Sequence, residues 1–207
     1  MKRIIFDVDN TLIPWKDEYR NAIKKTIEKY KLNVDYLKVD AVIETYEEYY
    51  DYYSKENMLE LINNHFKLNL NIDFVEYWLK QLGKMAEKDH KVIETIEYLS
   101  KKYELVILTN WFKENQIERL KEAGIYKYFK EIYAGEEVLK PNKQSYLNAI
   151  ENYKPEECFM IGDSYEMDIK EANKLGLKTI LIDSKNKYPE SAEYTKITKI
   201  IDLKEIL

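Results

Sequence analysis

The most constraining feature of this 207-residue sequence lies near its start, where an apolar run leads directly into two aspartates. Ile4, Ile5 and Phe6 precede Asp7, and Asp9 follows one residue later. A short apolar run of this kind is typical of a strand that is buried on both faces in a parallel sheet. Asp7 would then lie at the carboxyl end of the strand, where open α/β sheets bind their ligands.

Two carboxylates placed so close together need a cation, a shared proton or backbone N–H groups to compensate their charge. The stretch therefore indicates a metal site, an acid/base pair or both. A plain strand followed by a polar turn is the simpler alternative, and this stretch alone does not exclude it.

The composition limits the class of protein. Hydrophobic residues make up 45% of the chain, which allows a sizeable core and argues against disorder. The formal net charge of −5 argues against a broad surface for nucleic-acid polymers or acidic membranes. The single cysteine, Cys158, excludes an internal disulfide and indicates a reducing compartment. With no signal-peptide pattern and no membrane-length apolar run, we expect a cytoplasmic protein, monomeric by default with a dimer left open.

The chain changes its pattern twice after the first strand. From about residue 16 to 86, four amphipathic patterns at helical spacing follow one another, and no strand is predicted. From residue 89 onward, helices alternate with short apolar runs, which predicts a doubly wound parallel sheet. The predicted helices lie at 90–102, 113–123, 141–153 and 167–175, and the predicted strands at 105–109, 131–134, 158–161, 179–182 and, at the edge, 199–201. We therefore predict an α/β fold with a Rossmann-like core, residues 1–14 and 88–207, and an inserted four-helix cap, residues 15–87.

Polar residues follow the predicted strands at the points where the strands end. Thr109 and Asn110 follow the second strand, Asp163 follows Gly162 after the fourth, and Asp168 comes five residues later. Right-handed crossovers bring these ends to one edge of the sheet. Each motif has an ordinary alternative, such as a helix N-cap or a turn, but their order along the chain favours one shared site.

Lys140 lies between these motifs, directly before Pro141, which suits the first position of a helix. Together with the strand-end residues it gives four carboxylates, a hydroxyl, an amide and one lysine. Hard oxygen ligands match Mg²⁺, and the lysine, the hydroxyl and turn N–H groups match the oxygens of a phosphoryl group.

This set resembles the motifs of the haloacid dehalogenase superfamily of phosphohydrolases. The stretch from Asp7 to Thr11 resembles the first motif, Thr109 the second, Lys140 the third, and Gly162-Asp163 with Asp168 the fourth. The helical segment is similar in position and size to the cap that the family inserts after its first motif. Related phosphatases often have glycine after Thr-Asn, whereas this chain has Trp111, whose ring would narrow the pocket and change the choice of substrate.

The resemblance implies Mg²⁺-dependent hydrolysis of a small phosphorylated metabolite, either a nucleotide monophosphate, phosphoglycolate or a sugar phosphate. Asp7 would be the nucleophile that forms an aspartyl-phosphate, and Asp9 the general acid and base. Lys140 would stabilise the developing charge. The metal ligands would be Asp7, the carbonyl of Asp9, Asp163 and, through water or by orienting Lys140, Asp168. The transferring oxygens would be held by the amides of Val8 and Asp9 and by Thr109, Asn110 and Lys140.

Four other functions share parts of this pattern. A dehalogenase would use the same nucleophile but needs no acid at Asp9, because halide leaves unprotonated. A sugar-phosphate mutase shares all the core motifs and remains an alternative. A phospho-signalling receiver module places its acidic pair and its phosphorylated aspartate after different strands. A non-catalytic phospho-binding protein would gain nothing from carboxylates that repel one another.

Overall fold

The computed structural model describes residues 2–207, which contain one six-stranded sheet in the order β3-β2-β1-β4-β5-β6. Every neighbouring pair of strands is parallel, which confirms the predicted doubly wound, Rossmann-like architecture. The strands are β1 (Lys2–Phe6), β2 (Tyr103–Leu108), β3 (Phe129–Tyr133), β4 (Cys158–Gly162), β5 (Lys178–Ile182) and β6 (Thr195–Ile197). Because β1 lies between β2 and β4, the residues that follow it stand at the centre of the sheet's carboxyl edge.

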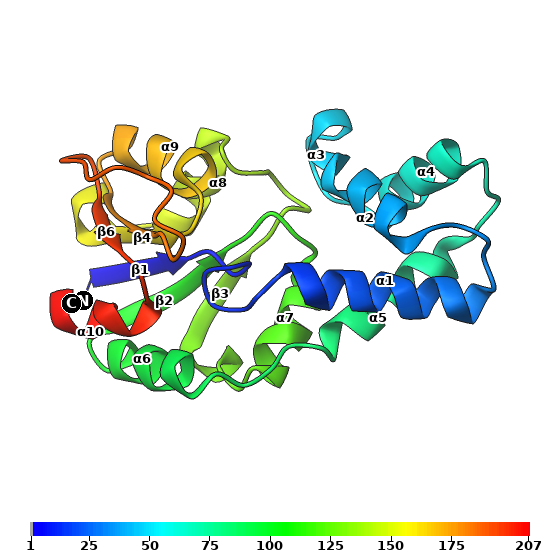
Figure 1. The fold of residues 1–207 in the computed structure, drawn as a ribbon. Coiled ribbons are helices and arrows are strands. Elements are labelled where there is room, and N and C mark those ends of the chain that lie inside the picture. Colours follow the sequence, from blue (N-terminus) through cyan, green and yellow to red (C-terminus); the bar gives the residue numbers. More distant parts are fainter. Residues whose placement is uncertain (1) are drawn as a thin grey trace.

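Helices cover both faces of the sheet (Figure 1). One face carries α6 (His90–Ser100), α7 (Lys113–Glu122) and α10 (Leu203–Ile206), and the other carries α8 (Lys143–Ile150) and α9 (Lys170–Lys174). Ile4 and Phe6 pack into the hydrophobic cluster that includes Ile96 of α6, whereas Ile5 packs with Tyr146 of α8. Both faces of β1 are therefore buried, which explains its uninterrupted apolar run.

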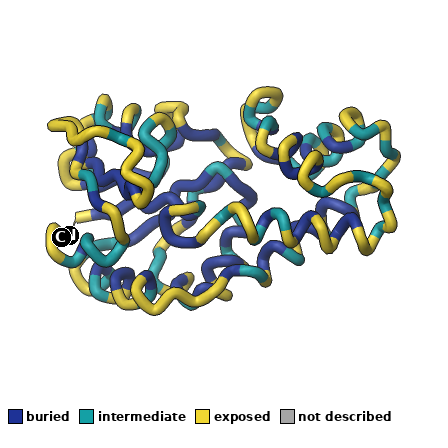
Figure 2. Tube along the Cα trace, in the orientation of Figure 1, coloured by how far each residue is buried: buried dark blue, intermediate teal, exposed yellow. Residues whose placement is uncertain are grey.

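The central strands are buried along most of their length, as Figure 2 shows. Four short turns complete the core: 3₁₀ turns at Tyr126–Tyr128, Pro155–Glu157 and Ile200–Asp202, and a π-helical turn at Tyr165–Ile169. Within residues 2–207, no helix combines the length and the apolar character that a membrane span requires.

The segment between β1 and α6 contains helices and no named strand, and it lies beside the sheet (Figure 1). It has its own hydrophobic cluster, which Trp111, Phe112 and Leu139 of the core join. The four predicted helices are present as five, because the second pattern is interrupted at Thr45, whose hydroxyl donates to the Val42 carbonyl at 2.7 Å. The helices are α1 (Lys16–Tyr30), α2 (Tyr36–Glu44), α3 (Tyr46–Tyr49), α4 (Lys55–Phe66) and α5 (Ile72–Gly83). The domain boundaries at residues 15 and 87 stay a prediction.

Three elements differ from the predictions in ways that have a clear cause. The helix predicted from Pro141 begins at Lys143, because Asn142 caps it by accepting from the Gln144 amide at 2.9 Å. The helix predicted from residue 167 to 175 is a π-helical turn followed by the five-residue α9. The edge strand predicted at 199–201 is wrong, because the strand that pairs with β5 is β6. Residues 200–202 form a 3₁₀ turn, in which the Asp202 carboxylate accepts from the Lys199 amide at 3.1 Å.

Candidate active site

Three aspartates converge at the carboxyl edge of the sheet. Asp7 follows β1, Asp163 follows β4, and Asp168 lies in the π-helical turn after β4. One carboxylate oxygen of each residue lies within 4.8 Å of the corresponding oxygens of the other two. Asp168 can approach only because residue 162 is glycine, since a Cβ there would lie 2.1 Å from Asp168 Oδ2. The structure thus brings together the carboxylates of three of the four aspartates that the sequence selects, and their role as metal ligands stays a prediction.

Lys140 is buried in the loop between β3 and α8 and bridges two of these carboxylates. Its Nζ donates to Asp7 Oδ1 at 2.7 Å and to Asp168 Oδ1 at 2.6 Å. Burial by itself lowers the pKa of Lys140, but the two carboxylates outweigh it and raise the pKa well above its ordinary value. Lys140 is therefore a fixed positive charge beside Asp7.

Asn110 holds the backbone of Lys140 in place. Its Oδ1 accepts from the Lys140 amide at 2.7 Å, and its Nδ2 donates to the Lys140 carbonyl at 2.9 Å. The sequence predicts Asn110 as a phosphate ligand. In the structure its side-chain amide braces the backbone of this lysine, which is a role that depends on loop geometry and has no signal in the sequence. Its role as a phosphate ligand stays a prediction.

The acidic cluster carries more negative charge than Lys140 can neutralise. Burial raises the pKa of Asp163 to about 7, and repulsion from Asp7 and Asp168 adds to this effect. Burial also raises the pKa of Asp168 to about 6, against the opposing attraction of Lys140. A divalent cation would offset the burial of these carboxylates and their mutual repulsion. Carboxylate oxygens are the ligands that Mg²⁺ prefers. The residues present therefore fit such an ion.

The carboxylate of Asp9 is not part of this cluster and is bonded to side chains of α7. Its Oδ1 accepts from Arg119 Nη1 at 2.5 Å, and its Oδ2 accepts from Gln116 Nε2 at 2.9 Å. Burial raises the pKa of Asp9, Arg119 opposes this shift, and Asp7 adds to it. Because both side-chain oxygens are engaged on α7, a metal ion at the cluster would have only the Asp9 carbonyl to bind, and this role of the carbonyl stays a prediction.

Gln116 and Arg119 are site residues that the sequence reasoning missed. Both side chains are fully buried, although α7 has few apolar residues and resembles a solvent-exposed helix. The only indication in the sequence is that the two residues are three positions apart, and so on one face of the helix that follows the predicted second motif.

The remaining predicted residues lie around Asp7. The hydroxyl of Thr11 donates to Asp7 Oδ2 at 2.9 Å, so each oxygen of Asp7 has a fixed donor. Thr109 is buried, and its Oγ1 accepts from Gln116 Nε2 at 3.0 Å. The side chain of Val8 is fully buried in the core, so only its backbone is available to a ligand.

The helical segment touches the core beside Lys140 through α3 and the residues after it. Glu47 accepts from Asn110 Nδ2 at 3.2 Å and from the Tyr53 hydroxyl at 3.1 Å. The Tyr53 amide donates to the Gly135 carbonyl at 2.7 Å, and a Cβ on Gly135 would lie 2.7 Å from the Tyr53 ring. This close approach fixes α3 on the loops that carry Asn110 and Lys140.

Trp111 anchors the helical segment and does not narrow the pocket as the sequence suggests. Its side chain is fully buried, and its ring packs against Tyr19, Tyr53 and Trp78 at centroid distances of 4.9, 5.1 and 5.7 Å. The aromatic ring after Thr-Asn therefore belongs to the hydrophobic cluster of the helical segment.

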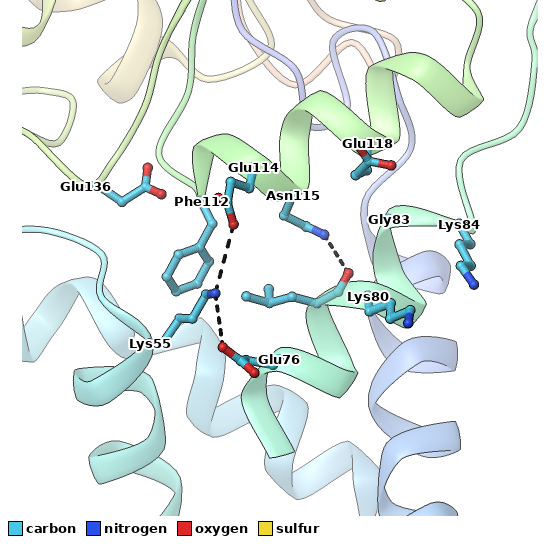
Figure 3. Close-up of a pocket in the computed structure, with 11 residues that line it drawn as sticks. Lys55, Glu76, Lys80, Gly83, Lys84, Phe112, Glu114, Asn115, Glu118 and Glu136 are labelled. Atoms are coloured by element: carbon cyan, nitrogen blue, oxygen red, sulfur yellow. Dashed lines mark hydrogen bonds and ion pairs between the residues drawn. The ribbon is translucent and has the colours of Figure 1, made fainter. Parts of the chain in front are cut away.

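Two cavities are candidates for binding a substrate, and they differ in whether they reach the acidic cluster. The cavity in Figure 3, of about 360 Å³, lies where α4 and α5 face α7, and it is lined by none of the acidic cluster. Lysines and glutamates alternate around it, as where Lys55 Nζ lies 3.5 Å from Glu76 Oε1 (Figure 3). A second cavity, of about 530 Å³, has Asp163, Thr11, Trp15 and Lys187 in its wall. Since this second cavity adjoins the acidic cluster, it is the better position for a substrate.

Comparison with known proteins assigns the family. The haloacid dehalogenase-like hydrolase family matches residues 4–182. The chain belongs to this family. It is 31% identical to the glyceraldehyde 3-phosphate phosphatase of Methanopyrus kandleri, over 88% of this chain and 84% of that protein. Such phosphatase relatives place it in the phosphatase branch of the family.

Proteins that match this chain over nearly its whole length have the same fold. The chain is 26% identical to the HAD-hydrolase YfnB of Bacillus subtilis, over 100% of this chain and 97% of that protein. The crystal structure of YfnB bound to magnesium superposes with a TM-score of 0.80 at 19% identity, covering 99% of this chain and 97% of that one. The HAD phosphatase from Thermococcus onnurineus superposes with a TM-score of 0.72 at 22% identity, covering 100% and 97%.

Proposed function

We propose that this protein is a Mg²⁺-dependent phosphatase that hydrolyses a small phosphate monoester through an aspartyl-phosphate on Asp7. The observation that carries the proposal is the position of Lys140, which contacts Asp7 and Asp168 beside a third carboxylate, Asp163. A nucleophilic carboxylate must approach an anionic phosphate, and a lysine with a bound cation offsets that repulsion.

The first step forms a bond between an oxygen of Asp7 and phosphorus, and the bond to the leaving oxygen breaks. Lys140 and Thr11 hold Asp7 so that its carboxylate cannot turn away. Asp9 gives a proton to the leaving oxygen, which departs as an alcohol. Thr109 and the backbone amides after Asp7 hold the transferring oxygens.

The second step returns the enzyme to its starting state. Asp9 takes a proton from water, the water oxygen bonds to phosphorus, and the bond to Asp7 breaks to release inorganic phosphate. Asp7, Asp163 and the Asp9 carbonyl would hold Mg²⁺, with Asp168 supporting Lys140. When bound, the ion supplies positive charge that stabilises the phosphoryl oxygens. Magnesium in the structure of YfnB and the acidic cluster of this chain both support this cofactor.

The relatives suggest the range of substrates. Glyceraldehyde 3-phosphate phosphatases of three archaea and the pyrimidine 5′-nucleotidase PynA of Streptococcus pneumoniae are similar in sequence. We therefore propose a small sugar phosphate as the first class to test, followed by nucleotide monophosphates and phosphoglycolate.

The test measures phosphate release from a panel of these esters with Mg²⁺ and with a chelator. We expect release only with Mg²⁺, and isomerisation of hexose phosphates without net release would instead favour a mutase.

The substitution Asp7→Asn should lower turnover by about 10⁴-fold or more, because the amide cannot form the acyl phosphate. Circular dichroism would check that the variant is folded. Turnover close to that of the wild type would remove Asp7 as the nucleophile.

A further inference from the structure

A chain of hydrogen bonds begins on α7 and ends on two predicted active-site residues. Arg119 and Gln116 have fully buried side chains, and both lie on α7, the helix that follows β2. Arg119 also contacts the start of the helical segment, since its Nη2 donates to the Pro14 carbonyl and to Glu18 Oε2, both at 3.0 Å. A buried arginine with this many partners holds its neighbours in one arrangement.

Arg119 determines the orientation of the Gln116 amide. Its Nη1 donates to Asp9 Oδ1 at 2.5 Å and to Gln116 Oε1 at 2.8 Å. A guanidinium can only donate, so Gln116 must present its carbonyl oxygen to Arg119. The amide nitrogen of Gln116 must then face the opposite side, toward Asp9 and Thr109.

The two N–H groups of Gln116 are directed at both of these residues. Nε2 donates to Asp9 Oδ2 at 2.9 Å and to Thr109 Oγ1 at 3.0 Å. Asp9 therefore has a donor on each oxygen, which prevents rotation of its carboxylate. Since Thr109 accepts from Gln116, its own hydroxyl hydrogen remains to be donated to an acceptor, and a phosphoryl oxygen is such an acceptor.

We propose that Arg119 and Gln116 are positioning residues, in which Arg119 fixes the direction of the Asp9 carboxylate and Gln116 sets the Thr109 hydroxyl to donate to the phosphoryl group. The inference rests on the proposed phosphatase function, because it assigns an effect on proton transfer to the leaving oxygen and on phosphate binding. A displacement of about 1 Å in a catalytic group costs on the order of 100-fold in rate, so such fixing has a measurable effect.

Two phosphate esters separate the two positioning effects. Glycerol phosphate has an alkoxide leaving group that needs a proton from Asp9, whereas dinitrophenyl phosphate has a leaving group that departs unprotonated. Arg119→Met should lower kcat/KM for glycerol phosphate by about 100-fold and for dinitrophenyl phosphate by less than about 5-fold. Gln116→Leu should lower both by about 10-fold, because it also frees Thr109.

The matched control is Arg3→Met, which removes another fully buried arginine with two carboxylate partners, at the opposite end of the sheet. It should change the two kcat/KM values equally, by less than about twofold per folded molecule. Arg119→Lys keeps the charge between Asp9 and Glu18, and it should recover part of the glycerol phosphate activity that Arg119→Met loses.

Equal losses on both esters in Arg119→Met, or the same ester dependence in Arg3→Met, would overturn the positioning role while leaving the phosphatase function intact. A wild-type protein that cleaves neither ester with Mg²⁺ would overturn the proposed function, and this inference with it.

Discussion

The two ends of the sheet each bury a cation between two carboxylates. At the carboxyl end, Lys140 contacts Asp7 and Asp168. At the amino end, Arg3 Nη2 lies 2.5 Å from Glu104 Oε1 and 2.6 Å from Glu151 Oε2. Judged only by the burial of the cation and by the number of its carboxylate partners, the two groups are alike.

They differ in the balance of charge. At the amino end, Lys130 also contacts Glu104 at 2.9 Å, so two cations face two carboxylates. Burial of Glu104 is overcome by its hydrogen bonds to Lys130 and Arg3, and its pKa is lowered. At the carboxyl end one lysine faces three carboxylates, and the pKa values of Asp163 and Asp168 are raised. A balanced group stabilises the fold, whereas an unbalanced one is typical of a site that binds a cation or a substrate.

Among the substitutions that test this difference between the two ends, Lys140→Met should have the largest effect on activity. It removes the charge beside Asp7, and we expect kcat to fall by about 10²- to 10³-fold. Steady-state kinetics at saturating Mg²⁺ would measure the change. A variant with more than about one tenth of wild-type kcat would mean that Lys140 serves stability, like Arg3.

Arg3→Met should show the opposite pattern. We expect a loss of about 2–3 kcal/mol in the free energy of unfolding, less than for a fully buried pair because Glu151 reaches solvent. Denaturant titration measures the loss, and kcat per folded molecule should stay unchanged. A specific loss of kcat would show that the two ends are coupled.

Gly162→Ala should disturb the carboxyl end without changing any charge. The added Cβ would displace the Asp168 carboxylate, which then no longer holds Lys140. We expect activity or Mg²⁺ affinity to fall by about 10- to 100-fold. Wild-type kinetics in this variant would indicate that Asp168 does not need to support Lys140.

The two ends should also respond to pH in opposite directions. The pKa of Asp163 is raised from 3.8 to about 7 in the folded protein, so without metal the stability that its protonated form contributes is lost as pH rises through 7. The pKa of Glu104 is lowered from 4.5, so its contribution is lost only as pH falls below that value.

Because Mg²⁺ and protons compete for Asp163, Mg²⁺ affinity should increase on the order of 10-fold from pH 6 to pH 8. Calorimetric titration would measure it, with Asp163→Asn as the variant that loses the dependence. A Kd that does not change over this range would place the ion away from Asp163.

The residues at the carboxyl ends of β1 and β4 could be predicted because a general rule places them. Apolar runs identify the strands, and right-handed crossovers bring Asp7, Asp163 and Asp168 to one edge. Lys140 follows from its position before α8. The edge strand could not be predicted correctly, because Ile200 and Ile201 are more apolar than the short β6 that forms the pairing.

The supporting residues could not be predicted because their roles depend on tertiary contacts. Polar side chains at positions 116 and 119 suggest a solvent-exposed helix until the burial of α7 is known. The bonds from Asn110 to the backbone of Lys140 form only when the loop carrying Lys140 is placed against it. Trp111 suggests a pocket wall until the aromatic rings around it are seen.

The contact between Tyr53 and Gly135 attaches the helical segment to the sheet's loops at a position far along the chain from its two covalent connections to the core. A swing of this segment away from Asp7 must break the bond from the Tyr53 amide and separate its ring from Trp111 and Phe112. The rate at which phosphate escapes would then depend on the contacts of Tyr53, a residue that takes no part in the proposed chemical steps.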